Sequence, residues 1–199
     1  MPRLISWLLI ALPLFAGSPV FNGNFSNSKD WTVVRGIAFT DPSVLRQGRK
    51  AMVVEPLEAS DAYVKSSPVH LVIGKRYEVS GYARTESLSV QDAGRTPIAV
   101  GATLSMASMP FDMHSESVGG THEWTRLRLR FMATRVEDHI VLKVAEGASF
   151  RGKAWFEGVA IDEVSGEDAW PVKAAVRTFG PAYRYPQGGW IYLHLQGEP

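Results

Sequence analysis

Two short segments pair a tyrosine with a cation at the spacing that places both side chains on one side of a β-strand. Tyr82 and Arg84 lie in "RYEVSGYART", and Tyr63 and Lys65 lie in "AYVKSS". Residues two apart in a strand point to the same face of a sheet. A phenol ring offers a flat apolar surface, and a cation offers directional hydrogen-bond donors. Together they can hold a ligand that has an apolar face and an edge of hydroxyls.

Further polar side chains that could reach such hydroxyls lie in one predicted loop. The stretch "MPFDMHSES" contains Asp112, His114 and Glu116. A carboxylate accepts hydrogen bonds from hydroxyls, and an imidazole can donate or accept them. We predict that Asp112 and His114 contact a ligand from the rim of the sheet. The alternative for His114 is a solvated loop histidine without a ligand.

Three arginines alternate with apolar residues in "EWTRLRLRFMA", namely Arg126, Arg128 and Arg130. Three aligned cations could hold a sulfated or uronic polysaccharide, or phosphates. The commoner arrangement is an outward face whose cations alternate with acids of the adjacent strand. We therefore do not count this row as a ligand site.

The sequence contains no recognisable catalytic constellation. It has no cysteine, so a thiol nucleophile is excluded. Its five histidines do not form an HExxH pattern or another metal-ligand spacing, and no serine lies in a GxSxG elbow. A glycosidase would need two facing carboxylates, and nothing singles out such a pair. We expect this chain not to be an enzyme, and we expect it to need no cofactor.

The elements that must position these residues are predicted to be β-strands. Short β-rich runs recur between clusters of Gly, Pro, Asp and Ser over residues 20–164, and no segment keeps a helical period. The runs are "WTVV", "KAMVVEP", "AYVKSS", "RYEVSGYART", "PIAVGATLSM", "EWTRLRLRFMA", "DHIVLKVAE" and "AWFEGVAIDEV". Their number and spacing predict an all-β fold, a two-sheet antiparallel jelly-roll sandwich.

Alternation within the runs predicts which side chains face the core. In "RYEVSGYART" it turns Tyr77, Val79 and Ala83 inward, so the Tyr82 ring should face open water. In "PIAVGATLSM" the outward row consists of small residues, which should leave a hollow above the sheet: Ala99, Gly101, Thr103 and Ser105. If these strands and "AYVKSS" are neighbours, both tyrosine–cation pairs flank one shallow floor.

Four segments in this order resemble the successive signatures of carbohydrate-binding modules of families four, nine and twenty-two. They are "NGNFSNSKDW", "GKRYEVSGYART", "GTHEWTRLRLRFMA" and "GKAWFEGVAIDEV". Those modules are galactose-binding-like jelly rolls, and the resemblance extends over roughly three quarters of the chain. It implies sugar recognition on the exposed face of a sheet or at its rim. On this basis Tyr82 and Arg84 are the first candidates for ligand contact, and Tyr63 and Lys65 are the second.

The resemblance also assigns roles to other residues. Trp124 and Phe156 match framework positions, and Trp155 could serve either the framework or the ligand. Many members of the group hold a structural calcium ion through one carboxylate near the first strand and another near the last. Ser26 and Glu157 stand at those positions here. Since calcium prefers several oxygen ligands, the loss of one carboxylate weakens the site, and we do not predict calcium.

Composition and the chain ends predict an exported protein. The 199 residues carry a net charge of +1, so no overall field favours nucleic acid or anionic lipid as a partner. Residues 1–17 have the layout of a cleaved signal peptide, with a basic residue, an apolar stretch and then small residues, and the alternative is an N-terminal anchor. Cleavage would leave no stable membrane insertion, and the protein would be secreted or periplasmic. Residues 18–166 form the predicted sandwich domain.

Residues 167–199 differ in character from the sandwich. They begin as a segment rich in Pro, Gly and Ala and end in "GGWIYLHLQGEP". This ending resembles the first strand of hydrolases of the acyl-coenzyme A:6-aminopenicillanic acid acyltransferase family, whose fold is of the N-terminal-nucleophile type. The resemblance implies a linker and the first strand of a second, catalytic domain that is missing from this chain.

Three functions of different classes are compatible with these observations. The first is a noncatalytic module that binds a polysaccharide and holds an appended hydrolase near it. The second is a packing domain of the same fold, in which Tyr63 and Tyr82 are buried against a partner domain. The third is a small hydrolase in its own right.

Overall fold

A computed structural model of the chain describes residues 23–26, 29–57, 60–91, 99–109, 113–146 and 150–165. The predicted signal segment 1–17, the predicted second-domain segment 167–199 and Asp112 lie outside these residues. All the regular structure in the described part is β-strand. This part of the chain also holds no helix long and apolar enough to cross a membrane.

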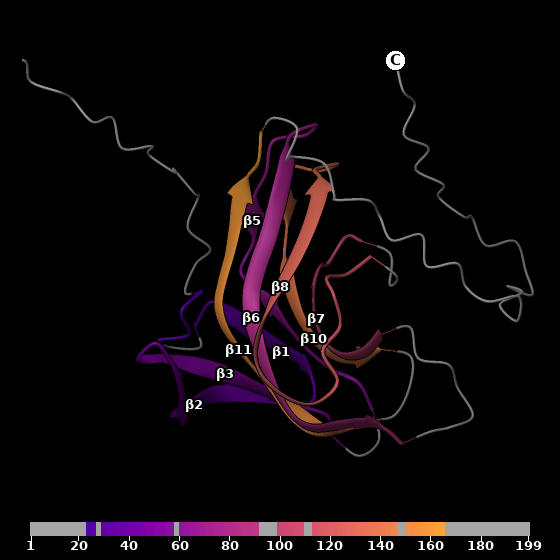
Figure 1. Ribbon diagram of the computed structural model, residues 1–199. Helices are drawn as coiled ribbons and strands as arrows, with labels where there is room; N and C mark the ends of the chain where they lie inside the picture. Colours follow the sequence, from indigo (N-terminus) through magenta and orange to yellow (C-terminus); the bar gives the residue numbers. More distant parts are fainter. Residues whose placement is uncertain are drawn as a thin grey trace, which may run out of the picture.

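The strands form two antiparallel sheets and a short two-stranded ribbon (Figure 1). The four-stranded sheet has the order β1-β4-β10-β7, the five-stranded sheet has the order β2-β3-β11-β6-β8, and β5 pairs with β9. The bounds are β1 Trp31–Arg35, β2 Ile37–Arg46, β3 Arg49–Glu55, β4 Ala62–Ser66, β5 Val69–His70, β6 Arg76–Val90, β7 Ala99–Met106, β8 Gly120–Met132, β9 Glu137–Asp138, β10 Ile140–Glu146 and β11 Phe150–Glu163. The predicted all-β, two-sheet antiparallel jelly-roll sandwich is confirmed.

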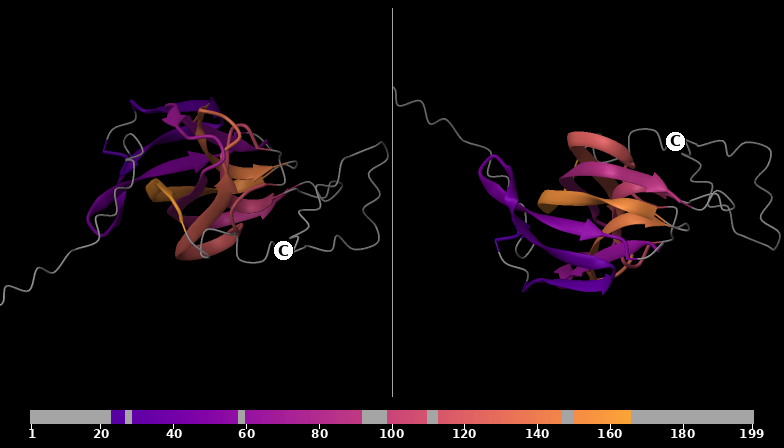
Figure 2. Two further views of the ribbon diagram at one scale, coloured as in Figure 1. Left: turned by 90° about the horizontal axis from the view of Figure 1, so that it is seen from above. Right: turned by 90° about the horizontal axis from the view of Figure 1, so that it is seen from below.

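The long strands β6, β8 and β11 form the middle and one edge of the five-stranded sheet. In the right-hand view of Figure 2 the salmon, magenta, orange and purple strands follow the order β8, β6, β11 and β3. Inward side chains of these strands fill the core, as the alternation in β6 predicts: Tyr77, Val79 and Ala83 are all buried. Phe156 of β11 is fully buried in the same core. Burial of each large apolar side chain contributes about 1.5–3 kcal/mol to the stability of the fold.

Strand β2 was not predicted, because Asp41, Pro42 and Ser43 interrupt it with turn-forming residues. The structure accommodates them in an irregularity of the β2–β3 pairing between Asp41 and Leu45. Since β2 is an edge strand, the missing N–H of Pro42 costs no hydrogen bond to a neighbouring strand. Beyond the irregularity the two strands pair again, at Arg46 and Arg49, so the hairpin bends before its tip.

The prediction that the two tyrosine–cation pairs flank one floor is wrong. Strand β4, with Tyr63 and Lys65, pairs with β1 and β10 in the four-stranded sheet. Strand β6, with Tyr82 and Arg84, pairs with β8 and β11 in the five-stranded sheet. Because both pairs point outward, they lie on opposite faces of the sandwich.

The prediction of an open hollow above β7 is also wrong. Residues 113–118 run along β7 and cover its outward row. Thr103 and Ser105 are fully buried, and the Ser105 hydroxyl donates to the carbonyl of Met113 over 3.0 Å. At Gly101, an added Cβ would lie 2.2 Å from the carbonyl oxygen of Val118. The small residues therefore admit a neighbouring segment of the same chain and not a ligand.

Candidate ligand-binding face

The outward side of the five-stranded sheet gathers aromatic and charged side chains from three adjacent strands. We call it the five-stranded face. Alternation places every second side chain of β11, β6 and β8 on it. The main ones are Lys153, Trp155 and Glu157 from β11, Tyr82 and Arg84 from β6, and Trp124 and Arg126 from β8.

Trp155 forms the floor of this face. It is only 3% exposed although it points away from the sandwich core, and it packs with Ala51 and Val53 of β3. Its indole N–H donates to the Asp41 carboxylate over 2.9 Å. Hydrogen bonds from Ser43 and then from Trp155 hold the pKa of Asp41 below its ordinary value, because they stabilise the ionised form. The ring is thus held in one orientation.

Polar and aromatic groups border this floor. Trp124 is half-buried and packs against the cluster around Trp155. The guanidinium carbon of Arg84 lies 5.5 Å from the centre of the Trp155 ring, and the ammonium of Lys153 lies 5.0 Å from it. Arg84 is 3.8 Å from the exposed carboxylate of Glu123, a distance that leaves its donors available to a ligand. The arrangement combines apolar surface with fixed hydrogen-bond donors.

Tyr82 lies on the same face, but a side chain covers its ring. The guanidinium carbon of Arg46, from the β2–β3 hairpin, lies 3.2 Å from the ring centre. The Arg46 side chain is only 13% exposed, and its Nη1 donates to Glu157 Oε2 over 2.9 Å. The ring is not wedged between the sheets, yet it does not face open water as predicted. The reason is the bend of the hairpin, which brings Arg46 over it.

Glu157 anchors this arrangement. Its carboxylate is fully buried and forms ion pairs with Arg46 and with Arg49, whose Nε lies 2.7 Å from Oε1. Removing one partner of a buried pair costs about 3–5 kcal/mol, whereas an aromatic stacking contact contributes about 0.5–1.5 kcal/mol beyond its buried area. A single sugar ring therefore cannot displace Arg46 from Tyr82 by stacking alone.

The same contacts decide how well calcium fits the position of Glu157. A calcium ion would need the carboxylate that two guanidinium groups already neutralise. Ser26, at the other implied position, brings no carboxylate. Among the described residues no three His, Asp or Glu side chains gather as a metal ion requires. The residues present do not fit the structural calcium that the resemblance implies.

The other predicted contacts lie elsewhere. Tyr63 and Lys65 are half-buried on the outward side of the four-stranded sheet, with the Arg35 guanidinium 5.9 Å from the Tyr63 ring. His114 lies on the segment that covers β7, where its Nδ1 is 2.6 Å from the carbonyl oxygen of Ser115. Of the predicted residues that the structure describes, it therefore brings together only Tyr82 and Arg84.

The arginine row of β8 forms ion pairs with an acid of the adjacent strand. Arg130 Nε lies 2.6 Å from one carboxylate oxygen of Glu78, and Arg126 Nη2 lies 3.7 Å from the other. Glu78 is almost fully buried on β6. The interpretation of this row as cations that alternate with acids is confirmed for these two arginines.

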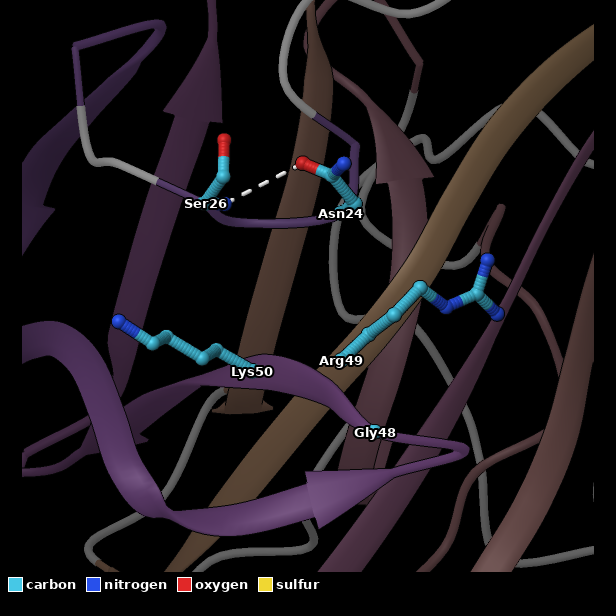
Figure 3. Close-up of a pocket in the computed structure, with 5 residues that line it drawn as sticks. All are labelled: Asn24, Ser26, Gly48, Arg49 and Lys50. Atoms are coloured by element: carbon cyan, nitrogen blue, oxygen red, sulfur yellow. Dashed lines mark hydrogen bonds between the residues drawn. The ribbon is translucent and has the colours of Figure 1, made fainter.

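A small cavity of about 220 Å³ lies beside the hairpin (Figure 3). It is lined by Asn24, Ser26, Gly48, Arg49 and Lys50. The Arg49 and Lys50 side chains point in opposite directions, so their charges do not converge on it. Ligand pockets usually enclose about 300–1,000 Å³. We do not assign a ligand to this cavity.

Sequence reasoning missed Asp41 and Arg46, both on the unpredicted strand β2. The run "VLRQGRK" could have indicated them, since a two-residue Gln-Gly turn between alternating residues is typical of a β-hairpin. Both turn residues have positive φ, 50° at Gln47 and 75° at Gly48. The tight turn fixes Arg46 and Arg49 opposite each other on the two strands.

No protein-family model matches the chain, and no curated protein is significantly similar to it. Among solved structures, several carbohydrate-binding modules are similar to the chain at low identity and low TM-score. The xylan-binding module CBM22-2 of Xyn10C from Paenibacillus barcinonensis has 9% identity and a TM-score of 0.49, with 73% of this chain and 97% of that chain covered. TmCBM61, solved with β-1,4-galactotriose, has 16% identity and a TM-score of 0.46, with 73% and 94% covered.

A two-module structure gives a similar result. The CBM22-1–GH10 part of endo-1,4-β-D-xylanase 10B from Clostridium thermocellum, complexed with xylohexaose, has 15% identity and a TM-score of 0.47. The match covers 73% of this chain but only 28% of the xylanase chain. Similarities of this size do not establish what the present chain binds.

Proposed function

We propose that the chain is a noncatalytic glycan-binding module and that the five-stranded face is its binding surface. The observation that carries the proposal is Trp155, a large aromatic side chain fixed at an outward position and bordered by Trp124, Arg84 and Lys153. A tryptophan on the central strand β11 and another on the edge strand β8, beside donors that are not fully engaged, suit a ligand with an apolar face and a hydroxylated edge.

Each residue has a distinct role in this proposal. Trp124, which packs against the cluster around Trp155, supplies ring surface for the C–H face of a sugar. Arg84 donates hydrogen bonds to hydroxyls or to a carboxylate, and Lys153, whose ammonium also lies near the Trp155 ring, adds a second donor. Asp41 keeps the indole of Trp155 oriented.

The proposal includes an exported protein in which the module holds an appended hydrolase near a polysaccharide. The composition of residues 1–17 and the change of character after residue 166 support it. Tethering raises the concentration of the catalytic domain at its substrate without adding any new contact.

Affinity electrophoresis of the 199-residue chain through gels that contain one polysaccharide each tests the binding function. We expect at least one polysaccharide to retard the parent chain, and we expect Trp124→Ala and Arg84→Ala to abolish that retardation. Tyr63→Ala is the matched control, because it removes an outward aromatic side chain from the opposite sheet. Equal retardation of the parent and of Trp124→Ala, together with loss in Tyr63→Ala, would contradict the proposed location.

A second candidate, a packing domain, is favoured by an apolar group at one end of the sandwich. Backbone hydrogen bonds join two turns here, for example from Leu71 N to Val136 O at 2.8 Å. Exposed apolar side chains lie on or next to these turns: Val72, Ile73, Met132 and Val136. A partner domain would cover such side chains. Failure of every polysaccharide to retard the parent chain would favour this function.

A further inference from the structure

We infer that Arg46 is a built-in cover of a second sugar subsite on Tyr82, so that the β2–β3 hairpin controls the length of glycan that the face accepts. This inference rests on the proposed function. It goes further because it names a residue that restricts the site and predicts that removing this residue improves binding.

The position of Tyr82 defines the second subsite. Along β6 it is two residues from Arg84, and across the sheet it pairs with Glu157, which is two residues from Trp155. Two residues of a strand span about 6–7 Å. A ring stacked on Tyr82 would therefore lie next to a ring bound at Trp124 and Arg84, on the same face.

Arg46 occupies the place of that ring. Its planar guanidinium lies 3.2 Å from the ring centre of Tyr82, which is contact distance for a stacked ligand. One edge of the guanidinium is held by Glu157, so the cover is fixed and not a chance contact of an exposed side chain. A ligand can therefore reach Trp124 and Arg84 on this face, whereas Arg46 blocks its access to the Tyr82 ring.

The hairpin tip is joined to β2 through a break in the regular pairing. Residues 42–44 of β2 lie between the pairs Asp41–Ala51 and Leu45–Lys50, whereas β3 continues without a break. The side chains of Arg46 and Arg49 hold the tip against the face through contacts with Glu157 and, for Arg46, with the Tyr82 ring. Arg49 keeps Glu157 neutralised if Arg46 leaves.

The test compares four forms of the full chain: the parent, Arg46→Ala, Tyr82→Ala and the double variant. Their dissociation constants are measured by calorimetry with an oligosaccharide of the polysaccharide that retards the parent. We expect Arg46→Ala to bind about 5–10-fold tighter, as one added aromatic contact allows. We expect Tyr82→Ala to bind like the parent, and we expect the gain to vanish in the double variant.

The outcomes separate this inference from the proposed function. If the parent binds and Arg46→Ala binds equally or more weakly, Arg46 is not a cover and the inference is wrong while the proposed function stands. A gain that persists in the double variant also overturns it. If no glycan binds either the parent or Arg46→Ala, both fail together.

A second variant guards against misfolding. Arg46→Lys keeps a cation for Glu157 but lacks the flat guanidinium that stacks on the ring. It should remain folded by circular dichroism and bind more tightly than the parent, by a smaller factor than Arg46→Ala. If Arg46→Ala does not fold, unchanged or weaker binding by Arg46→Lys overturns the inference.

Discussion

Replacing Glu157 with glutamine should destabilise the sandwich strongly, because it neutralises a fully buried acid that Arg46 and Arg49 share. The side chain is fully buried, Arg46 is 13% exposed and Arg49 is 47% exposed. Breaking a buried pair costs about 3–5 kcal/mol. Since water can reach Arg49, we expect the low end, about 3 kcal/mol, which corresponds to a fall of about 6–12 °C in Tm for a domain of this size.

Urea unfolding followed by far-ultraviolet circular dichroism measures this loss. The midpoint should fall while the slope with denaturant stays unchanged, as expected for a change in stability alone. Glu163→Gln is the matched control, because it removes the same charge from an exposed pair with Lys75 at 2.7 Å. The control should unfold like the parent. If Glu157→Gln costs no more than the control, the ion-paired cluster does not hold the hairpin and the reasoning is refuted.

Two other perturbations test the packing around the face. Gly101→Ala should lower the free energy of unfolding by at least about 2 kcal/mol, since φ is 138° and the new Cβ would lie 2.2 Å from Val118 O. The control is Gly74→Ala, at φ 81° with nothing within 4 Å of the new Cβ, which should cost less. Equal losses of the two variants in urea unfolding would contradict this. The lowered pKa of Asp41 implies a stabilising contribution that is present above its ordinary pKa and is lost as pH falls through the lowered value. Asp41→Asn loses the negative charge and one of the two oxygens that accept from Trp155 and Ser43. The stability difference between the parent and this variant should therefore shrink between pH 6 and pH 3, and a difference that grows on acidification would count against this.

Local pattern was sufficient to predict most strands and which way their side chains point. In β6 the two-residue period placed Tyr82 and Arg84 outward and Val79 inward, as the structure has them. The same period in β8 placed its arginines outward. These features depend only on residues that are close in the sequence, so they can be predicted from it.

Sheet membership and side-chain cover could not be predicted in the same way. Whether β4 or β11 pairs with β6 depends on contacts between distant residues, and alternation looks identical in both cases. The stacking of Arg46 on Tyr82 depends on a bend after Asp41 in β2, and the turn-forming residues there made this part of the strand read as a loop in the sequence. The predicted outward direction of Tyr82 and Arg84 was therefore right, and the predicted shared floor with Tyr63 and Lys65 was wrong.

The most direct test of the proposed binding face is a titration of the ¹⁵N-labelled chain with the retarding glycan, observed at the indole N–H signals. Each signal is assigned by single tryptophan replacements. We predict saturable shifts of the Trp124 and Trp155 signals and no shift of Trp31, which is buried in the core. Saturable binding that leaves Trp124 and Trp155 unmoved, or that perturbs only residues around Tyr63 on the opposite sheet, would contradict it.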